Sequence, residues 1–370
     1  MHFFTGKVAI VHEWLVDYSG SEKVLEQLLK IFPQAELFAV VDFLPDDLRW
    51  YIQHKPVQTT FIQRLPFARK NYRNWLPLMP MAIEQLDVSG YDLVISNSHA
   101  VSKGVITNSE QLHICYCHSP IRYAWDLYHT YLGESGFGRA KSVLAKAVLH
   151  YMRQWDLSTI NRIDHFLCNS EYIARRIAKT YRREATVIYP PVDTNGFKGE
   201  LPKEDFYFTA SRMVPYKRLD LIVQAFRHLP GKRLVVIGSG PDFEKIKALA
   251  PGNVELMGFQ PKQVLVNHMQ RAKAFIFAAD EDFGIIPVEA QAAGTPVIAY
   301  KKGGALETVA EGSTGVFFEQ QTPEAIARAI GLFEQKAAGF NPGHIRAHAQ
   351  QFSESIFRER VTTFIQNTLS

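Results

Sequence analysis

Two glutamates on either side of a short turn are the first residues in this chain whose spacing suggests chemistry. Glu281 is the first residue of the segment EDFGIIPVE, and Glu289 is its last. Because proline suits the first position of a helix, we expect Pro287 to begin one. Glu281 is then a loop acid and Glu289 an acid in the first helical turn. Carboxylates accept hydroxyl hydrogen bonds, and exposed N–H groups at residues 283–286 lie between them. The segment therefore predicts a site for a hydroxyl-rich ligand such as a sugar or a ribose.

Two cations follow a strand candidate in the same half of the chain. Arg212 and Lys217 lie in SRMVPYKRLD (211–220), after DFYFTA and before a helical pattern. Cations at the end of a strand and beside the start of a helix suit a diphosphate. An exposed loop without a ligand is the alternative, and the loop taken alone favours it. A nearby G-x-G in VVIGSGP lacks the third glycine of the dinucleotide fingerprint, because Phe243 stands there.

The first half of the chain offers a glycine and a histidine. Gly20 lies in DYSGSEKV (17–24), where a strand gives way to a helix whose free N–H groups attract phosphate. A plain turn is the alternative for this glycine. His118 ends an apolar strand in YCHSPIRYAWD (116–126) and is a candidate contact for a sugar or a leaving group. A structural, hydrogen-bonded histidine is the alternative there.

Apolar runs alternate with helical patterns, which predicts parallel sheets built from βα repeats. The expected strands are KVAIVHEWL, ELFAVV, DLVISNS, LHICYCHS, DHFLCNS, DFYFTAS, RLVVIG, NVELMG, AFIFAA, PVIAY and GVFF. A linker punctuated by proline and glycine at 187–197 divides them. We therefore expect two doubly wound, Rossmann-like α/β domains, residues 1–190 and 191–350, facing a central cleft. Residues 351–370 are expected to form a helix that packs back toward the N-terminal domain.

Composition narrows the class of protein. Apolar residues make up 46% of the chain and charged residues 21%, which is typical of a globular protein. The sequence has no apolar run of about 20 residues, as a membrane span needs, and no signal-peptide pattern, so we expect a cytoplasmic protein. The spacing of Cys115, Cys117 and Cys168 indicates buried thiols rather than disulfides or a metal site. A net charge of +4 gives no reason to expect nucleic acid as a partner.

The combined motifs resemble one family. EDFGIIPVE followed by AQAAGTPVIA resembles the signature of the family 4 retaining glycosyltransferases, which have the two-domain GT-B fold. SRMVPYKRLDLIVQAF, VVIGSGP, VELMGF, GGALETV and EGSTGVFF follow in the family's order, so the resemblance covers nearly the whole chain. VHEWLVDYSGSEKVLE and HICYCHSPIRYAWDLY are similar to O-antigen mannosyltransferases of the WbaZ-like subgroup. The resemblance implies an acceptor-binding N-terminal domain and a nucleotide-sugar-binding C-terminal domain.

The resemblance also implies roles for the cationic candidates. Arg212 and Lys217 would hold the donor diphosphate, helped by the backbone of Gly20. The family has no agreed protein nucleophile, so the donor phosphate itself would accept the proton of the acceptor. Arg212 and Lys217 would then stabilise the leaving nucleotide as its charge grows. Here Ser19 and Ser21 flank Gly20, where the family often has Gly and Ala, and these serines would tighten the loop or alter how the phosphate is approached.

The remaining candidates would contact the sugar nucleotide through hydrogen bonds. Glu281 would bind hydroxyls of the donor sugar, Glu289 would bind the ribose hydroxyls, and His118 would contact and orient the sugar. The backbone donors would be Phe283, Gly284 and Ile285. Asp282 replaces a family glycine and creates an accidental D-x-D at 280–282, but we expect no metal, since Arg212 and Lys217 supply the charge.

The implied activity is transfer of a hexose with retention. We expect mannose from GDP-mannose, in an alpha linkage, to a lipid-pyrophosphate-linked saccharide of O-antigen or exopolysaccharide synthesis. The alternatives are a UDP-sugar donor and a non-catalytic subunit that binds a sugar nucleotide. Cations cluster without acids at 54–83 and 135–155, so an anionic membrane is an expected partner on the cytoplasmic face of the bacterial inner membrane. Residues 55–81 mix cations with aromatic residues and either lie in that interface or form a helical hairpin packed on the sheet.

Overall fold

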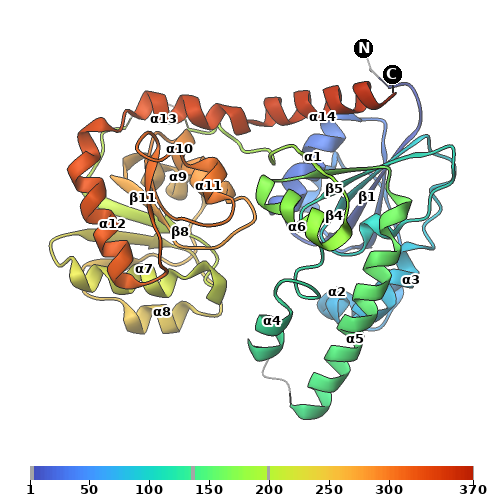
Figure 1. Cartoon of the computed structure of the whole chain (residues 1–370), viewed down its shortest axis with the longest axis horizontal. Helices are drawn as coiled ribbons and strands as arrows, with labels where there is room; N and C mark the ends of the chain where they lie inside the picture. Colours follow the sequence, from blue (N-terminus) through green and yellow to red (C-terminus); the bar gives the residue numbers. More distant parts are fainter. Residues whose placement is uncertain (1–3, 135–137, 198–200, 370) are drawn as a thin grey trace. The chain divides into compact units, whose positions relative to one another are not determined.

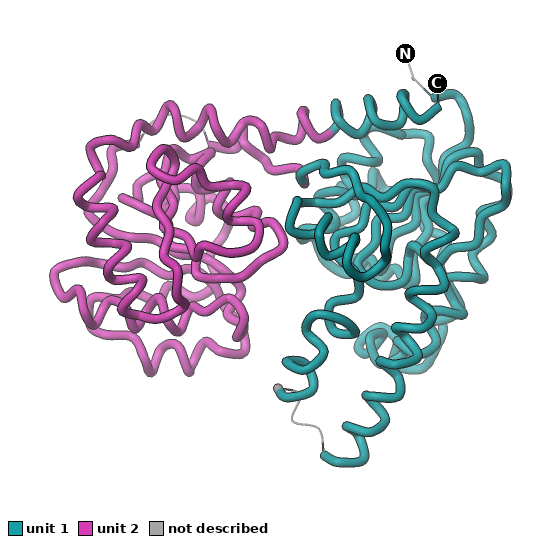
Figure 2. Tube along the Cα trace, in the orientation of Figure 1, with its two compact units in different colours: residues 1–189, 358–370 teal, residues 190–357 magenta. Residues whose placement is uncertain are grey.

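The computed structural model describes residues 4–134, 138–197 and 201–369, which fold as two compact units. Unit 1 comprises Met1–Tyr189 and Arg358–Ser370, and unit 2 comprises Pro190–Phe357 (Figure 2). The chain passes into unit 2 inside the segment where proline and glycine predict a linker. It returns to unit 1 within one long helix, α14 (Glu354–Leu369).

Unit 1 contains a seven-stranded parallel sheet in the order β3-β2-β1-β4-β5-β6-β7 (Figure 1). The strands are β1 (Val8–Leu15), β2 (Glu36–Asp42), β3 (Val57–Thr59), β4 (Leu93–Ser98), β5 (Leu112–Cys117), β6 (His165–Cys168) and β7 (Thr186–Val187). The order reverses between β1 and β4, which are neighbours in the sheet although β2 and β3 separate them in the chain. Such a reversal opens a crevice at the carboxyl ends of the two strands, where doubly wound folds bind ligands.

Helices cover the sheet of unit 1 through apolar faces. They are α1 (Gly20–Ile31), α2 (Ala68–Asn71), α3 (Met79–Ile83), α4 (Tyr128–Glu134), α5 (Arg139–Ser158), α6 (Glu171–Tyr181) and the larger part of α14. α1 buries Val24 and Leu28, as its 3.6-residue periodicity predicts. The C-terminal part of α14 buries Val361 and Ile365, and its Arg358 donates a hydrogen bond to Gln27 of α1. This segment therefore belongs to the core of unit 1.

The basic segment around residues 60–83 folds as short helical turns rather than as a hairpin of two helices. These are 3-10 turns at Phe61–Arg64 and Tyr72–Leu78, with α2 and α3 beside them. Ile62, Tyr72 and Met79 are buried in a cluster that also includes residues of α5. The segment therefore packs on unit 1 through one side, while the Phe67 side chain is 80% exposed.

Unit 2 contains a six-stranded parallel sheet in the order β10-β9-β8-β11-β12-β13. The strands are β8 (Phe206–Ala210), β9 (Arg233–Ile237), β10 (Val254–Leu256), β11 (Ala274–Phe277), β12 (Val297–Tyr300) and β13 (Gly315–Phe318). The order reverses between β8 and β11, as it does between β1 and β4 in unit 1. Unit 2 thus repeats the doubly wound arrangement and has its own switch point, where such folds bind ligands.

Helices lie on both faces of the sheet of unit 2 (Figure 1). They are α7 (Leu219–Ala225), α8 (Phe243–Leu249), α9 (Lys262–Arg271), α10 (Ile285–Ala292), α11 (Ala305–Thr308), α12 (Pro323–Lys336) and α13 (Pro342–Ala349). One buried cluster joins α7, α8 and α12 to one face, and a second joins α9, α10 and α11 to the other. Alternate residues of each strand, such as Tyr207 and Phe208 of β8, enter opposite clusters, so both faces are buried as in parallel sheets generally.

The predicted strands are all present, and the two that the sequence did not predict, β3 and β7, are edge strands of three and two residues. Cys115, Cys117 and Cys168 are buried free thiols, as expected. Throughout the part of the chain that the structure describes, no helix combines the length and the apolar character required to cross a membrane.

Candidate functional site

The cationic and acidic candidates of unit 2 lie in the two loops that leave the switch point of its sheet. Arg212 and Lys217 follow β8, and Glu281 follows β11, its neighbour in the sheet. Parallel strands bring their carboxyl ends to one edge, so residues far apart in sequence meet there. The structure joins two of them directly, because Lys217 Nζ forms an ion pair with Glu281 Oε1. Each of these two side chains is 17% exposed, whereas Arg212 is exposed.

Two glycines hold the Glu281 loop in place. Gly304 N donates to the carbonyl oxygen of Glu281 at 2.8 Å. A Cβ added to Gly303, whose φ is +66°, would lie 2.4 Å from that oxygen, and one added to Gly304 would lie 2.2 Å from Phe283 Cα. Only glycine permits this approach, which explains the GG of GGALETV. Lys302 also pairs with Asp280 at 2.9 Å, so two acids of the 280–282 run each pair with a lysine.

The helix after Glu281 begins earlier than the proline predicts. α10 starts at Ile285, two residues before Pro287, because Gly284 adopts φ +86° and turns the chain into the helix. The expectation that Pro287 is the first helical residue is therefore wrong, and Glu289 is the fifth residue of α10 rather than a member of its first turn. The N–H groups at the start of any helix have no partner inside it. Gly284 and Ile285 stand at that start.

The loop that carries Arg212 is supported by the G-x-G turn after β9. Ser211 N donates to Ile237 O at 3.1 Å, and Met213 N donates to Ser239 O at 2.8 Å. A Cβ at Gly238 would lie 1.9 Å from the carbonyl oxygen of Ser211, and the φ of Gly238 is +146°. The G-x-G that fails as a dinucleotide fingerprint therefore makes room for the Arg212 loop.

We expect Gly238→Ala to destabilise the fold by about 2–4 kcal/mol and to weaken nucleotide binding, because the new methyl group must displace the Arg212 loop. Gly252→Ala is the matched control, since a Cβ there meets nothing within 4 Å. Thermal unfolding and calorimetric titration with a nucleoside diphosphate measure the two effects. Equal behaviour of the two variants would contradict the supporting role of the turn.

In unit 1 the Gly20 loop is closed by a buried carboxylate. Gly20 is the first residue of α1. Glu22 Oε2 accepts from Ser19 N at 3.1 Å and from Ser19 Oγ at 2.9 Å, and Glu22 Oε1 accepts from Ser21 Oγ at 3.0 Å. The two serines therefore tighten the loop, which is one of the two effects expected from their replacement of family residues. Burial would raise the pKa of Glu22, but hydrogen bonds from His12 and Ser19 outweigh it and lower the pKa to about 2.

His118 directly follows β5 and is tied to the end of β4. Its Nε2 is 2.6 Å from Asn97 Oδ1, and its main-chain N–H donates to Ser98 O at 2.8 Å. Burial lowers the pKa of His118 to about 3, with a further contribution from His99, so the imidazole is neutral at pH 7. Asn97 also contacts His12, its register partner on β1. Asn97, His12 and Glu22 were not among the predicted residues. The available signal was a polar residue within an apolar strand for His12 and Asn97, and an acid in the first turn of α1 for Glu22.

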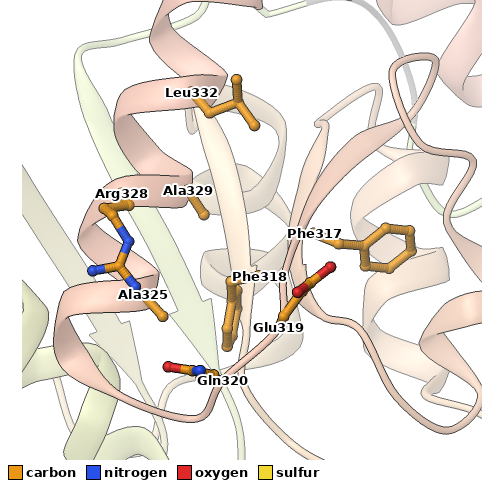
Figure 3. Close-up of a pocket in the computed structure, with 8 residues that line it drawn as sticks. All are labelled: Phe317, Phe318, Glu319, Gln320, Ala325, Arg328, Ala329 and Leu332. Carbon is orange, nitrogen blue, oxygen red and sulfur yellow. The ribbon is translucent and has the colours of Figure 1, made fainter.

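The structure thus gathers the predicted residues into two groups. Unit 2 holds the group at the start of α10 and the ends of β8 and β11, and unit 1 holds Gly20 and His118 with the polar residues that support them. A hollow of about 390 Å³ lies elsewhere in unit 2, between β13 and α12, where Arg328, Phe318 and Glu319 are among its lining residues (Figure 3). None of the predicted site residues lines it, and we assign it no role.

Two family models match the chain in succession. The Glycosyltransferase Family 4 model matches residues 18–195, and the Glycosyl transferases group 1 model matches residues 193–344. The two models meet where unit 1 gives way to unit 2. Together with the two doubly wound sheets, they place the chain in the family 4 glycosyltransferases of the GT-B fold.

The curated relatives match the chain at about 30% identity over roughly half of its length. A D-inositol 3-phosphate glycosyltransferase of Mycobacteroides abscessus is 30% identical over 222 residues, which cover 53% of this chain and 50% of the relative. A GDP-mannose-dependent alpha-(1-6)-phosphatidylinositol monomannoside mannosyltransferase of Mycolicibacterium smegmatis is 30% identical over 193 residues, covering 44% of this chain and 50% of the relative. The chain spans about half the length of the curated relatives it matches.

Solved structures share the fold over nearly the whole chain. Sucrose-phosphate synthase of Thermosynechococcus elongatus has a TM-score of 0.75 at 17% identity and covers 99% of both chains. Anabaena Alr3699/HepE, solved with UDP and glucose, has a TM-score of 0.69 at 18% identity and covers 96% of this chain and 98% of its own. At these identities the likeness shows the GT-B fold alone.

Proposed function

We propose that this protein is a retaining hexosyltransferase that uses a nucleotide-sugar donor. The observation that carries the proposal is the Lys217–Glu281 ion pair at the switch point of unit 2, beside the first N–H groups of α10. A cation and a carboxylate held together match the two chemistries of a sugar nucleotide, an anionic diphosphate and a hydroxyl-rich sugar. Arg212 in the adjoining loop adds a second, exposed cation for the diphosphate.

In the proposed reaction the acceptor hydroxyl oxygen bonds to the anomeric carbon as the bond from that carbon to the donor phosphate breaks. The hydroxyl proton passes to the departing phosphate oxygen on the same face, so the products are the glycosylated acceptor and a nucleoside diphosphate. Lys217 and Arg212 stabilise the charge that grows on the diphosphate. Glu281 orients the sugar, the N–H groups of Phe283, Gly284 and Ile285 bind the donor, and Glu289 binds the ribose. We propose that no metal takes part, since Lys217 and Lys302 already neutralise the acids of the 280–282 run.

We further propose GDP-mannose as the donor and an alpha linkage as the product. The support is the resemblance to O-antigen mannosyltransferases and the GDP-mannose dependence named for the Mycolicibacterium smegmatis relative. A UDP-sugar is the alternative, and the UDP-containing structures of Anabaena Alr3699/HepE favour testing it in parallel. A non-catalytic subunit that binds a sugar nucleotide is the alternative from another class.

In the decisive experiment the full chain is incubated with each of a panel of GDP- and UDP-sugars and with a lipid-pyrophosphate-linked saccharide as acceptor. Mass spectrometry then records whether the acceptor gains a hexose and which nucleotide is released. Transfer from GDP-mannose alone is the expected result. Transfer from a UDP-sugar alone would overturn the donor assignment, and tight nucleotide binding without any transfer would favour the non-catalytic subunit.

We also propose that the acceptor is lipid-linked and that unit 1 docks on an anionic membrane at the cytoplasmic face. The support is an exposed stretch in which cations lie on both sides of Phe67 in the chain; the Phe67 ring is exposed and its backbone is left-handed, with φ 58°. The cations of this Phe67 patch are Arg64, Arg69, Lys70 and Arg73. An exposed aromatic ring among cations suits the interface of an anionic bilayer.

Replacing two cations of the Phe67 patch is expected to weaken binding to anionic vesicles. Because each cation near such a surface contributes about 1 kcal/mol, Arg69→Glu with Lys70→Glu should lower the partition coefficient by about 30-fold or more. Co-sedimentation with phosphatidylglycerol-rich vesicles measures it, and phosphatidylcholine vesicles report non-electrostatic binding. Lys245→Glu with Lys247→Glu on α8, also exposed, is the matched control. Equal losses from the two double variants would contradict docking through this patch.

A further inference from the structure

Four polar side chains in unit 1 form a continuous row of hydrogen bonds across the switch point of its sheet. The row runs from Glu22 on α1 to His12 on β1, then to Asn97 on β4 and His118 after β5. The distances are 3.1 Å from Glu22 Oε1 to His12 Nε2, 3.1 Å from His12 Nδ1 to Asn97 Nδ2, and 2.6 Å from Asn97 Oδ1 to His118 Nε2. His12, Glu22 and Asn97 are all buried, so these bonds face little competition from water.

The orientation of the Asn97 amide is decided by a main-chain carbonyl. Asn97 Nδ2 lies 2.8 Å from the carbonyl oxygen of Ser21, which can only accept a hydrogen bond. The amide nitrogen must therefore face Ser21, and the amide oxygen must face His118. The second N–H of the same nitrogen points to His12 Nδ1, so both donors of Asn97 are used.

This orientation settles which ring nitrogens carry hydrogen. Asn97 Oδ1 is an acceptor, so His118 Nε2 carries the hydrogen and Nδ1 keeps its lone pair. By the same logic His12 Nδ1 accepts from Asn97, and His12 Nε2 donates to the Glu22 carboxylate. Since the pKa of Glu22 is lowered to about 2, the carboxylate is ionised and accepts this bond near neutral pH. Every hydrogen in the row is then accounted for.

His118 Nδ1 is the one end of the row left for a ligand. Among the described residues, no protein group donates a hydrogen bond to His118 Nδ1. The buried side-chain atoms that lack a hydrogen-bond partner do not include this nitrogen, so it is open to solvent. A neutral Nδ1 with a lone pair accepts a hydrogen bond from a hydroxyl, and it has no proton to give to a leaving group.

We infer that Asn97 is a positioning residue that holds His118 in the Nε2–H tautomer, so that His118 Nδ1 binds a substrate hydroxyl as an acceptor. Glu22 and His12 support Asn97 from the other side, and through Ser21 they tie His118 to the Gly20 loop. The inference deepens the proposed function, on which its substrate rests. It excludes the alternative role of His118 as a donor to the leaving group.

The tautomer can be read directly from the full-length protein labelled with ¹⁵N-histidine. Two-bond ¹H–¹⁵N correlation spectra distinguish the Nε2–H, Nδ1–H and charged forms, and the signal absent in His118→Gln identifies His118. The expected result is Nε2–H for His118 in the wild type. An Nδ1–H or charged ring would overturn the inference, whatever the activity.

Two substitutions separate positioning from a merely structural role. Asn97→Ala removes the acceptor, and we expect a mixture of His118 tautomers and a kcat lowered about 10- to 100-fold. Asn97→Asp keeps an oxygen toward His118 but loses the donors to Ser21 O and His12 Nδ1, so it should retain the Nε2–H form and recover only part of kcat. Thermal unfolding checks that each variant is folded. An unchanged tautomer and kcat in Asn97→Ala would overturn the inference.

The outcomes also separate this inference from the proposed function. The expected tautomer in a protein that transfers no sugar from any donor would remove the proposed reaction, and with it the substrate hydroxyl assigned to His118. Sugar transfer by a protein whose His118 is in the Nδ1–H form would remove the inference and leave the reaction standing.

Discussion

Glu281→Ala is expected to lower the turnover number for sugar transfer by about 10²–10³-fold, because it removes a carboxylate proposed to orient the reacting sugar. Affinity for the nucleoside diphosphate should not fall. The carboxylate forms an ion pair with Lys217, so its removal takes away a group that competes with phosphate for that ammonium group. Steady-state kinetics with the active donor and calorimetry with its nucleoside diphosphate measure the two quantities separately.

The matched control for this change is Glu311→Ala. Glu311 is an exposed glutamate of unit 2 that lies 3.9 Å from Lys301, outside the candidate site. Exposed pairs of this kind contribute about 0–1 kcal/mol, so the control should retain normal turnover. A double-mutant cycle of Glu281→Ala and Lys217→Ala should be non-additive, because the two side chains contact each other. Near-normal turnover in Glu281→Ala would remove Glu281 from the reaction.

Arg212→Ala is expected to raise the dissociation constant of the nucleoside diphosphate by about 30- to 150-fold. A hydrogen bond between a guanidinium group and a phosphate contributes about 2–3 kcal/mol, which corresponds to this change. Affinity for the uncharged nucleoside should stay the same, since Arg212 is proposed to contact only the diphosphate. Arg212→Lys should recover part of the affinity, because lysine keeps the charge but not the planar pair of donors.

Arg233→Ala is the matched control for Arg212→Ala. Arg233 is the first residue of β9, so it lies at the amino ends of the strands, whereas the candidate site lies at their carboxyl ends. Arg233 pairs there with Glu255 at 2.7 Å. Calorimetric titration of both variants with the nucleoside diphosphate gives the comparison. Equal affinities would show that Arg212 does not bind the diphosphate and would shift that role to Lys217 and the start of α10.

Much of the fold follows from local pattern. Apolar runs bounded by small and polar residues predicted each strand of four or more residues, and alternation with helical patterns predicted two parallel sheets. The edge strands β3 and β7 were not predicted, because their residues, VQT and TV, form no apolar run, whereas the three-residue β10 lies in the alternating NVELMG. The start of α10 was also missed. Proline indicated Pro287, but the left-handed turn at Gly284 began the helix at Ile285, a choice that depends on backbone angles rather than on proline preference.

The candidate residues of unit 2 could be named from sequence, but their pairing could not. Lys217 and Glu281 are 64 residues apart, and they meet because β8 and β11 are neighbours in the sheet. The glycines at 238, 303 and 304 read as ordinary turn residues. Only the packing of loop against loop shows that a Cβ there would collide with the backbone that carries Arg212 and Glu281.

The sequence by itself determined the kinds of element, the division into two α/β units, and which charged and polar residues follow strands. The tertiary structure alone decided which of these residues touch. His12 and Asn97 are 85 residues apart and meet through the register of β1 with β4. The physical reason is that hydrogen bonds and ion pairs act over a few ångströms. Which distant residues come that close depends on strand order and register, and the local sequence pattern contains neither.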